Sequence, residues 1–256
     1  MTTTRQNGSL YTNIQNKIAT LEFGHPASNS FPSELLARLT KELNILSENE
    51  SISVIILKSE GEKAFCAGAS FDELVAVSTL EEGKQFFAGF ANVINAMRTC
   101  GKIIIGRIQG KTVGGGVGLA AACDYVLATE NASIKLSELT IGIGPFVIEP
   151  AVRRKIGLAA ISELTLDATN WKNSYWAKEK GLYAKVFENI KELDKEVAIL
   201  AEKLASYNPQ ALSEMKKVLW ENTDYWDALL TERAAVSGTL VLSEFTKKAL
   251  SKFSKK

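Results

Sequence analysis

Helical spacing of apolar residues alternates with short apolar runs over the first two thirds of the chain. Residues 32–49, 71–75 and 80–97 place apolar side chains at the intervals of an amphipathic helix. The mostly apolar runs at 52–57 and 103–108 are typical of strands that are covered on both faces. Further short strands are predicted as a pair within 10–23, and at 125–128, 133–136 and 184–187.

This alternation of strands and helices predicts an α/β fold. After Pro150 the pattern is almost entirely helical up to the last residue. A length of 256 residues suits one domain, or one domain with a helical appendage. We therefore divide the chain into an α/β core over residues 1–190 and a helical region over 191–256, which would serve as a cap or as an oligomer surface.

Composition narrows the functional classes. Thirty basic and 29 acidic residues leave a net charge of +1, which provides no general attraction for nucleic acid. No apolar run is long enough to span a membrane, and the first residues contain no apolar core of a secretory signal. The three cysteines form no CxxC pair, which indicates reduced thiols and a cytoplasmic location. A single histidine, His25, makes a zinc site or a Ser-His-Asp triad a poor hypothesis.

Two segments rich in small residues each follow a predicted strand, at 64–71 and at 110–118. The second contains Gly114-Gly115-Gly116, but its spacing fails the P-loop pattern and fits the dinucleotide pattern only loosely. Glycines there could serve close backbone packing alone. The alternative is that both segments direct bare N–H groups at one oxygen, the arrangement of an oxyanion hole.

Four segments resemble the crotonase (enoyl-CoA hydratase/isomerase) superfamily, in the family's order and over most of residues 10–190. They are LEFGHPASNSF, AFCAGASFDEL, GKTVGGGVGLAAACDYVLAT and SIKLSELTIGIGP. The resemblance implies a spiral of ββα units, a C-terminal helical trimerisation region, and a homotrimer or hexamer. It also implies an acyl-CoA thioester as substrate, with coenzyme A as part of that substrate and no other cofactor or metal.

The resemblance also assigns residues to roles. The backbone N–H groups of Ala69 and Gly115 would bind the thioester oxygen. Ser70 stands where the family usually has aspartate. Residues expected at the substrate or the coenzyme A moiety are Ala27, Asn29, Ala67, Ser70, Phe71 and Pro145.

The carboxylates separate the family's reactions. Hydratases usually carry two catalytic glutamates, whose positions match Gly118 and Glu138 here, so one of the two is absent. The family's Δ3,Δ2-enoyl-CoA isomerases resemble this pattern, because one base can remove a proton and return it two carbons away. We therefore predict an enoyl-CoA isomerase with Glu138 as acid and base, and we expect an acid restored at Gly118 to face the thioester pocket.

Alternatives remain open at this stage. Glu138 could be a surface carboxylate at a helix start, where the helix dipole favours it. Hydration of an enoyl-CoA, including a methylglutaconyl-type substrate, could use Glu138 with water or with Glu149. Glu149 precedes Pro150 and otherwise reads as a plain helix-start carboxylate. A catalytically silent acyl-CoA-binding subunit is the third alternative.

Overall fold

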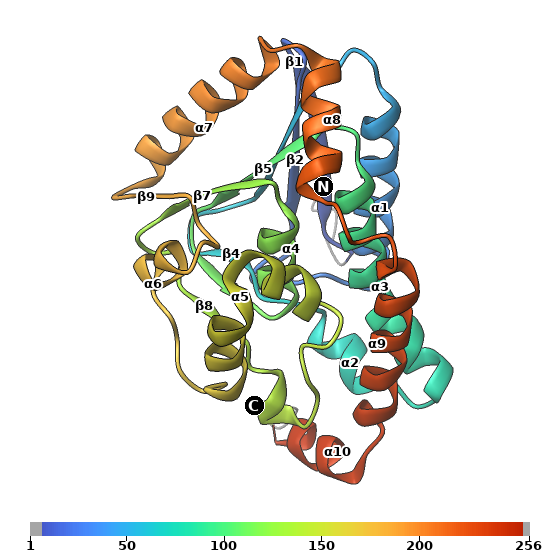
Figure 1. Ribbon diagram of the computed structural model, residues 1–256. Coiled ribbons are helices and arrows are strands. Elements are labelled where there is room, and N and C mark those ends of the chain that lie inside the picture. The colour runs from blue at the N-terminus through green and yellow to red at the C-terminus, as the bar shows by residue number, and fades with distance from the viewer. Residues whose placement is uncertain (1–6, 253–256) are drawn as a thin grey trace, which may run out of the picture.

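The computed structural model describes residues 7–252 and contains two β-sheets (Figure 1). The larger sheet has six strands in the order β1-β2-β3-β5-β7-β9. β1 and β2 pair antiparallel, and every later neighbour is parallel. Their bounds are β1 Ser9–Gln15, β2 Ile18–Gly24, β3 Val54–Ser59, β5 Ile103–Ile108, β7 Tyr125–Thr129 and β9 Lys185–Phe187.

The smaller sheet is parallel and consists of β4 (Ala64–Cys66), β6 (Lys111–Val113) and β8 (Ile134–Lys135). Each of these strands directly follows a strand of the larger sheet, so successive units contribute one strand to each sheet. This confirms the predicted spiral of ββα units. β4 and β6 have three residues each, too few to show the alternation of side chains that marks a strand in the sequence. Their residues were therefore predicted only as parts of the two segments rich in small residues.

The central strands β3 and β5 of the larger sheet are mostly apolar because helices cover both faces there, whereas β1 is largely exposed. One face packs in the main core with α1 (Ser33–Glu48), α3 (Leu80–Thr99) and α4 (Gly115–Ala122). On the other face, α7 (Ile190–Ala205) packs against a second cluster that includes Val54 and Ile105. Every residue of β5 is buried, as expected for a parallel strand between two helical layers.

The remaining helices lie along the core rather than apart from it. α9 (Trp226–Val241) runs beside α3 (Figure 1). α10 (Glu244–Ser251) follows α9 and packs against the 3₁₀ helix η1 (Glu138–Ile141). The others are α2 (Phe71–Ala76), α5 (Glu149–Leu166), α6 (Ser174–Glu179) and α8 (Pro209–Leu219). The proposed division at 190/191 stays a prediction, and its residues 1–6 and 253–256 lie outside the described residues.

A buried ion pair connects Lys216 of α8 with Asp124, which follows the end of α4. Lys216 Nζ lies 3.0 Å from Asp124 Oδ2, with side chains that are 2% and 3% exposed. The Lys216 ammonium also donates to the Lys102 carbonyl at 2.8 Å. Asp124 accepts further bonds from the Ile104 N–H and from the Trp220 indole, each at 2.7 Å. Because these partners satisfy the charges, Asp124 has a structural role and helps to fix the orientation of α4.

Candidate active site

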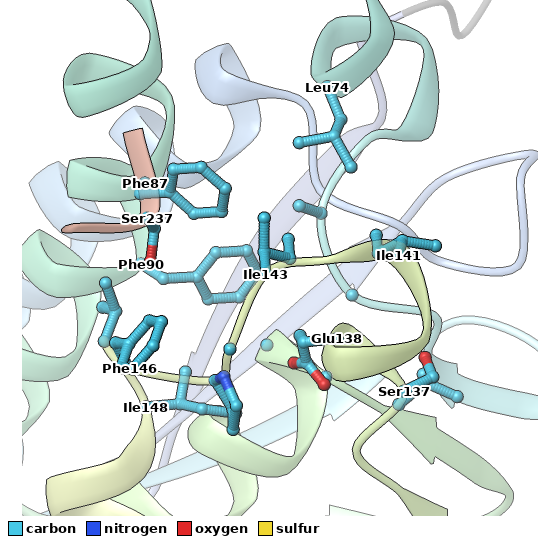
Figure 2. Close-up of a pocket in the computed structure, with 18 of the residues that line it drawn as sticks. Leu74, Phe87, Phe90, Ser137, Glu138, Ile141, Ile143, Phe146, Ile148 and Ser237 are labelled. Atoms are coloured by element: carbon cyan, nitrogen blue, oxygen red, sulfur yellow. The ribbon is translucent and has the colours of Figure 1, made fainter. Parts of the chain in front are cut away.

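A pocket of about 180 Å³ opens where the three strands of the smaller sheet end. Parallel neighbours end at the same edge of a sheet, so the loops after β4, β6 and β8 converge there. α2, α3 and α9 close the other sides, and Figure 2 shows their side chains around the cavity. Its wall is mostly apolar, and the larger apolar residues are Phe71, Leu74, Phe86, Phe87, Phe90, Val113, Ile141, Ile143, Phe146, Val147 and Ile148.

The backbone N–H groups of Ala69 and Gly115 lie at this pocket and donate to no backbone carbonyl among the described residues. Phe31 forms an isolated parallel bridge with Ala69, bonding to the Gly68 carbonyl at 2.8 Å and to the Ser70 N–H at 2.9 Å. In such a bridge the Ala69 N–H points away from Phe31. Gly115 begins α4, so its N–H has no helical acceptor. Ala69 and Gly115 both line the pocket.

Gly68 shows how closely the two segments approach. Its φ is +93°, and a β-carbon there would lie 3.3 Å from the Val113 carbonyl oxygen and 3.7 Å from the Gly115 nitrogen. A larger residue would be strained by this φ and would crowd the start of α4. The loop after β4 therefore lies against the N-terminus of α4, as two donors to one oxygen require. The assignment of Ala69 and Gly115 as that pair stays a prediction.

Gly114 brings the third segment to the same place. Its φ is +54°, and a β-carbon on it would lie 2.9 Å from Glu138 Oε1. Because Gly114 has no side chain, the Glu138 carboxyl group can lie directly against the backbone that precedes Gly115. Glu138 is thus next to the proposed oxygen site, and Figure 2 shows its carboxyl group inside the pocket.

Glu138 is half-buried as a residue, but its carboxyl group is enclosed. Oε2 is buried and has no hydrogen-bond partner among the described residues. Burial raises the pKa of Glu138 to about 7, partly offset by a hydrogen bond from its own backbone N–H. A carboxylate with a pKa near neutrality is well placed to take up and release a proton. The alternative of a surface carboxylate is wrong, because the group faces an apolar cavity.

No other titratable side chain lines this pocket in the described part of the chain. Glu149 begins α5, as predicted, and pairs with Arg153 at 3.9 Å without reaching the cavity. Cys66 is fully buried beneath the site, and desolvation raises the pKa of its thiol to about 12, which keeps it protonated and inert. Within residues 7–252, no group of three or more His, Cys, Asp or Glu could hold a metal ion.

The expectation that an acid at Gly118 would face the thioester pocket stays a prediction, but the structure shows what such a side chain would meet. A β-carbon on Gly118 would lie 2.5 Å from Ile148 Cγ2 and 2.7 Å from Ile148 Cβ. Ile148 is buried and lines the pocket. An isoleucine at the start of α5 therefore occupies volume that a carboxylate at position 118 would need.

The other residues predicted for substrate and coenzyme A divide into two groups. Ala67, Phe71 and Pro145 line the pocket. Ala27 is exposed outside it, and Asn29 and Ser70 are buried outside it. The Ser70 hydroxyl accepts a bond from the Glu73 N–H at 3.4 Å and so caps α2. The predicted contacts of all six with coenzyme A remain untested.

Asn29 has a clear local task. Its Nδ2 donates to the carbonyl oxygens of Glu60 at 2.8 Å and Ala64 at 2.9 Å, and its Oδ1 accepts from the His25 N–H at 3.0 Å. These bonds join the loop after β2 to the strand that leads into Ala69. Asn29 therefore helps to hold the backbone that leads to Ala69 in place.

Most of the apolar wall, and the serine that α9 contributes to it, were not predicted from the sequence. Phe86, Phe87 and Phe90 occupy neighbouring positions of one predicted helix, and their spacing could have marked an aromatic face. Ile148 and Ser237 carry no sequence signal of this kind. They enter the site only through the packing of α5 and α9.

The raised pKa of Glu138 predicts a pH-dependent stability difference. Between its ordinary value of 4.5 and about 7, the folded protein keeps a proton that the unfolded chain has released, so stability falls as pH rises. Glutamine at this position does not titrate. We expect Glu138→Gln to be more stable than wild type by about 3 kcal/mol near pH 8, and by much less near pH 4, in urea unfolding. Glu149→Gln is the control, and an equal Glu138→Gln effect at both pH values would contradict the burial argument.

The chain is similar to known proteins over most of its length. The enoyl-CoA hydratase/isomerase family model matches residues 13–254. A peroxisomal Δ(3,5)-Δ(2,4)-dienoyl-CoA isomerase of Arabidopsis thaliana is 32% identical over 75% of this chain and 72% of its own. A probable enoyl-CoA hydratase of Bacillus subtilis is 28% identical over 93% of each chain. An enoyl-CoA hydratase structure from Bacillus halodurans superposes with a TM-score of 0.89 at 22% identity, covering 95% of this chain and 99% of that one, and shows the same fold.

Proposed function

This chain belongs to the enoyl-CoA hydratase/isomerase family, and on that premise we propose that it shifts a double bond in an enoyl-CoA. The substrate would be a 3-enoyl-CoA and the product its conjugated 2-enoyl isomer. The observation that carries this proposal is that Glu138 supplies the one carboxylate among the described residues that line this apolar pocket, and that Ala69 and Gly115 line it too.

The proposed reaction needs one proton and one base. Ionised Glu138 takes a proton from C2, and the electron pair moves through the carbonyl carbon onto the thioester oxygen. The N–H groups of Ala69 and Gly115 stabilise that enolate oxygen. The enolate then re-forms the carbonyl, the double bond moves from C3–C4 to C2–C3, and C4 takes the proton back from Glu138. No redox or metal chemistry enters these steps, so we propose no cofactor beyond the coenzyme A of the substrate.

Hydration is the second candidate, and the Bacillus subtilis relative, a probable hydratase, favours it. Water addition is easiest with one group that activates the water and another that handles the α-proton. Here the position of the second group is Gly118, and Ile148 fills the adjacent space with hydrocarbon. An apolar wall at that point gives a water molecule no polar partner. In contrast, the Arabidopsis thaliana relative, a dienoyl-CoA isomerase that is 32% identical, favours the double-bond shift.

A panel of thioesters tests the proposal. A 3-enoyl-CoA should gain the absorbance of a conjugated thioester on incubation with the protein, and a 2-enoyl-CoA should keep it. Loss of that absorbance from the 2-enoyl-CoA, without isomerisation of the 3-enoyl-CoA, would show that the protein is a hydratase instead. Saturable binding with neither change would favour a silent acyl-CoA-binding protein. The homotrimer or hexamer stays a prediction.

Ile148 and Gly118 together predict how hydratase activity could be introduced. Gly118→Glu alone should destabilise the protein, because its side chain meets Ile148. The double variant Gly118→Glu, Ile148→Ala removes that obstacle and places two carboxylates around the reacting carbons. We expect it to hydrate a short 2-enoyl-CoA at least about tenfold faster than wild type, in keeping with the effect of a second acid-base group. Ile148→Ala alone is the control, and equal hydration by this variant would contradict the role of the added acid.

A further inference from the structure

Ser237 places an unpartnered hydroxyl at the pocket wall. The residue belongs to α9, is 1% exposed and lines the cavity. Its Oγ is buried and forms no hydrogen bond with any described residue. Figure 2 shows Ser237 beside Phe87 and Phe90, on the other side of the cavity from Ser137. A buried hydroxyl without a partner costs free energy, so its position calls for an explanation.

Other hydroxyls of the same helix are satisfied in the ordinary way. Thr231 donates to the Asp227 carbonyl at 2.8 Å, and Thr239 donates to the Ala235 carbonyl at 3.0 Å. These are the backbone bonds, one turn earlier, that serine and threonine usually form within helices. Ser237 forms no such bond. Its hydroxyl is therefore not used by its own helix, at a residue that lines the pocket.

The approach of two helices brings this hydroxyl to the cavity. A β-carbon on Gly83 would lie 2.8 Å from the Gly238 carbonyl oxygen and 2.9 Å from Gly238 Cα, so α3 and α9 cross in direct backbone contact. Any larger residue at Gly83 would separate the helices. This close contact puts Ser237, the neighbour of Gly238, against the aromatic face of α3.

We propose that the Ser237 hydroxyl binds an uncharged oxygen, a hydroxyl or carbonyl group, near the far end of a short acyl chain. The preferred substrate is then an oxygenated short-chain enoyl-CoA rather than a plain hydrocarbon one. This inference rests on the proposed function, because it takes the pocket as the acyl site. A serine hydroxyl both donates and accepts, so it suits either kind of oxygen.

The pocket sets the length and the charge of that chain. A cavity of about 180 Å³ is close in size to the roughly 150 Å³ cavity that accommodates benzene, which indicates an acyl group of about six carbons. Among the described residues, no lysine or arginine lines the cavity; Arg233 lies one turn before Ser237 on α9 but outside the lining residues. A carboxylate at the chain end would thus be buried without a counter-ion and in the same apolar pocket as Glu138, at a high cost.

Binding of saturated thioesters tests this recognition apart from catalysis. Butanoyl-, hexanoyl- and octanoyl-CoA would each be titrated calorimetrically beside the same thioester with a terminal hydroxyl or a terminal carboxylate. The proteins are wild type, Ser237→Ala and Thr239→Val. The last is the matched control, since it removes a hydroxyl from the same helix at an exposed position. Alanine favours helix formation, so Ser237→Ala should fold at least as well as wild type.

We expect wild type to bind at least one hydroxylated thioester about five- to tenfold more tightly than its plain counterpart, as one buried hydrogen bond provides. Ser237→Ala should lose that preference with little change toward plain thioesters, and Thr239→Val should keep it. Equal binding of each pair by wild type, or a preference that survives in Ser237→Ala, would overturn this inference alone. Tighter binding of the carboxylated thioester would overturn the uncharged chemistry. Failure of wild type to bind any acyl-CoA would instead contradict the proposed function.

Discussion

We expect Glu138→Gln to lower the turnover of a 3-enoyl-CoA by about 10²–10⁴ while the affinity for acyl-CoA changes little. Glutamine keeps the shape of the side chain but cannot accept the proton from C2. No second titratable group among the described residues lines the pocket to replace it. Steady-state kinetics should therefore show a large loss in kcat, and calorimetry with a saturated acyl-CoA should give a nearly unchanged Kd.

Glu149→Gln is the matched control for this measurement. It makes the same chemical change at a helix-start carboxylate that pairs with Arg153 and does not line the cavity. Its kcat should stay close to wild type. If Glu138→Gln retained near-wild-type turnover and Glu149→Gln did not, the acid-base role would pass to Glu149.

The second large effect is expected from the proposed oxyanion donors, the backbone N–H groups of Ala69 and Gly115. Side-chain truncation cannot remove a backbone N–H, but proline does. Gly115 is the first residue of α4, a position at which proline is tolerated in helices. Gly115→Pro should lower kcat by about 10²–10³, the typical loss for one such donor. Kinetics on protein whose circular dichroism matches that of wild type would measure this loss.

Gly115→Ala separates the lost N–H from crowding. A β-carbon at this position meets the Phe90 ring in either variant, but alanine keeps the N–H. The alanine variant should therefore be affected by packing alone and remain well above the proline variant in kcat. Equal activity of the two would mean that contact with Phe90, and not the missing donor, explains the loss.

Local patterns in the sequence predicted much of the fold. The leucines of α1 recur at helical spacing, and all five that the spacing indicates are buried. The continuous apolar character of β3 and β5 correctly predicted strands covered on both faces. The parallel pairing of β4 and β6 places the two segments of small residues side by side, whereas their delivery of two donors to one oxygen stays a prediction. Such features are local in sequence, so periodicity and motif spacing reveal them.

The sequence by itself determined the family, the ββα architecture and the presence of one carboxylate where two are usual. Only the tertiary structure decided how that carboxylate behaves. Burial in an apolar pocket raises the pKa of Glu138 to about 7, and residues of α3 and α9 line that pocket together with those of η1. The same holds for Ile148, which fills the space beside Gly118, and for Ser237, which α9 brings to Phe87. These contacts join residues far apart in the chain, and their distances arise from helix packing, which no local pattern encodes.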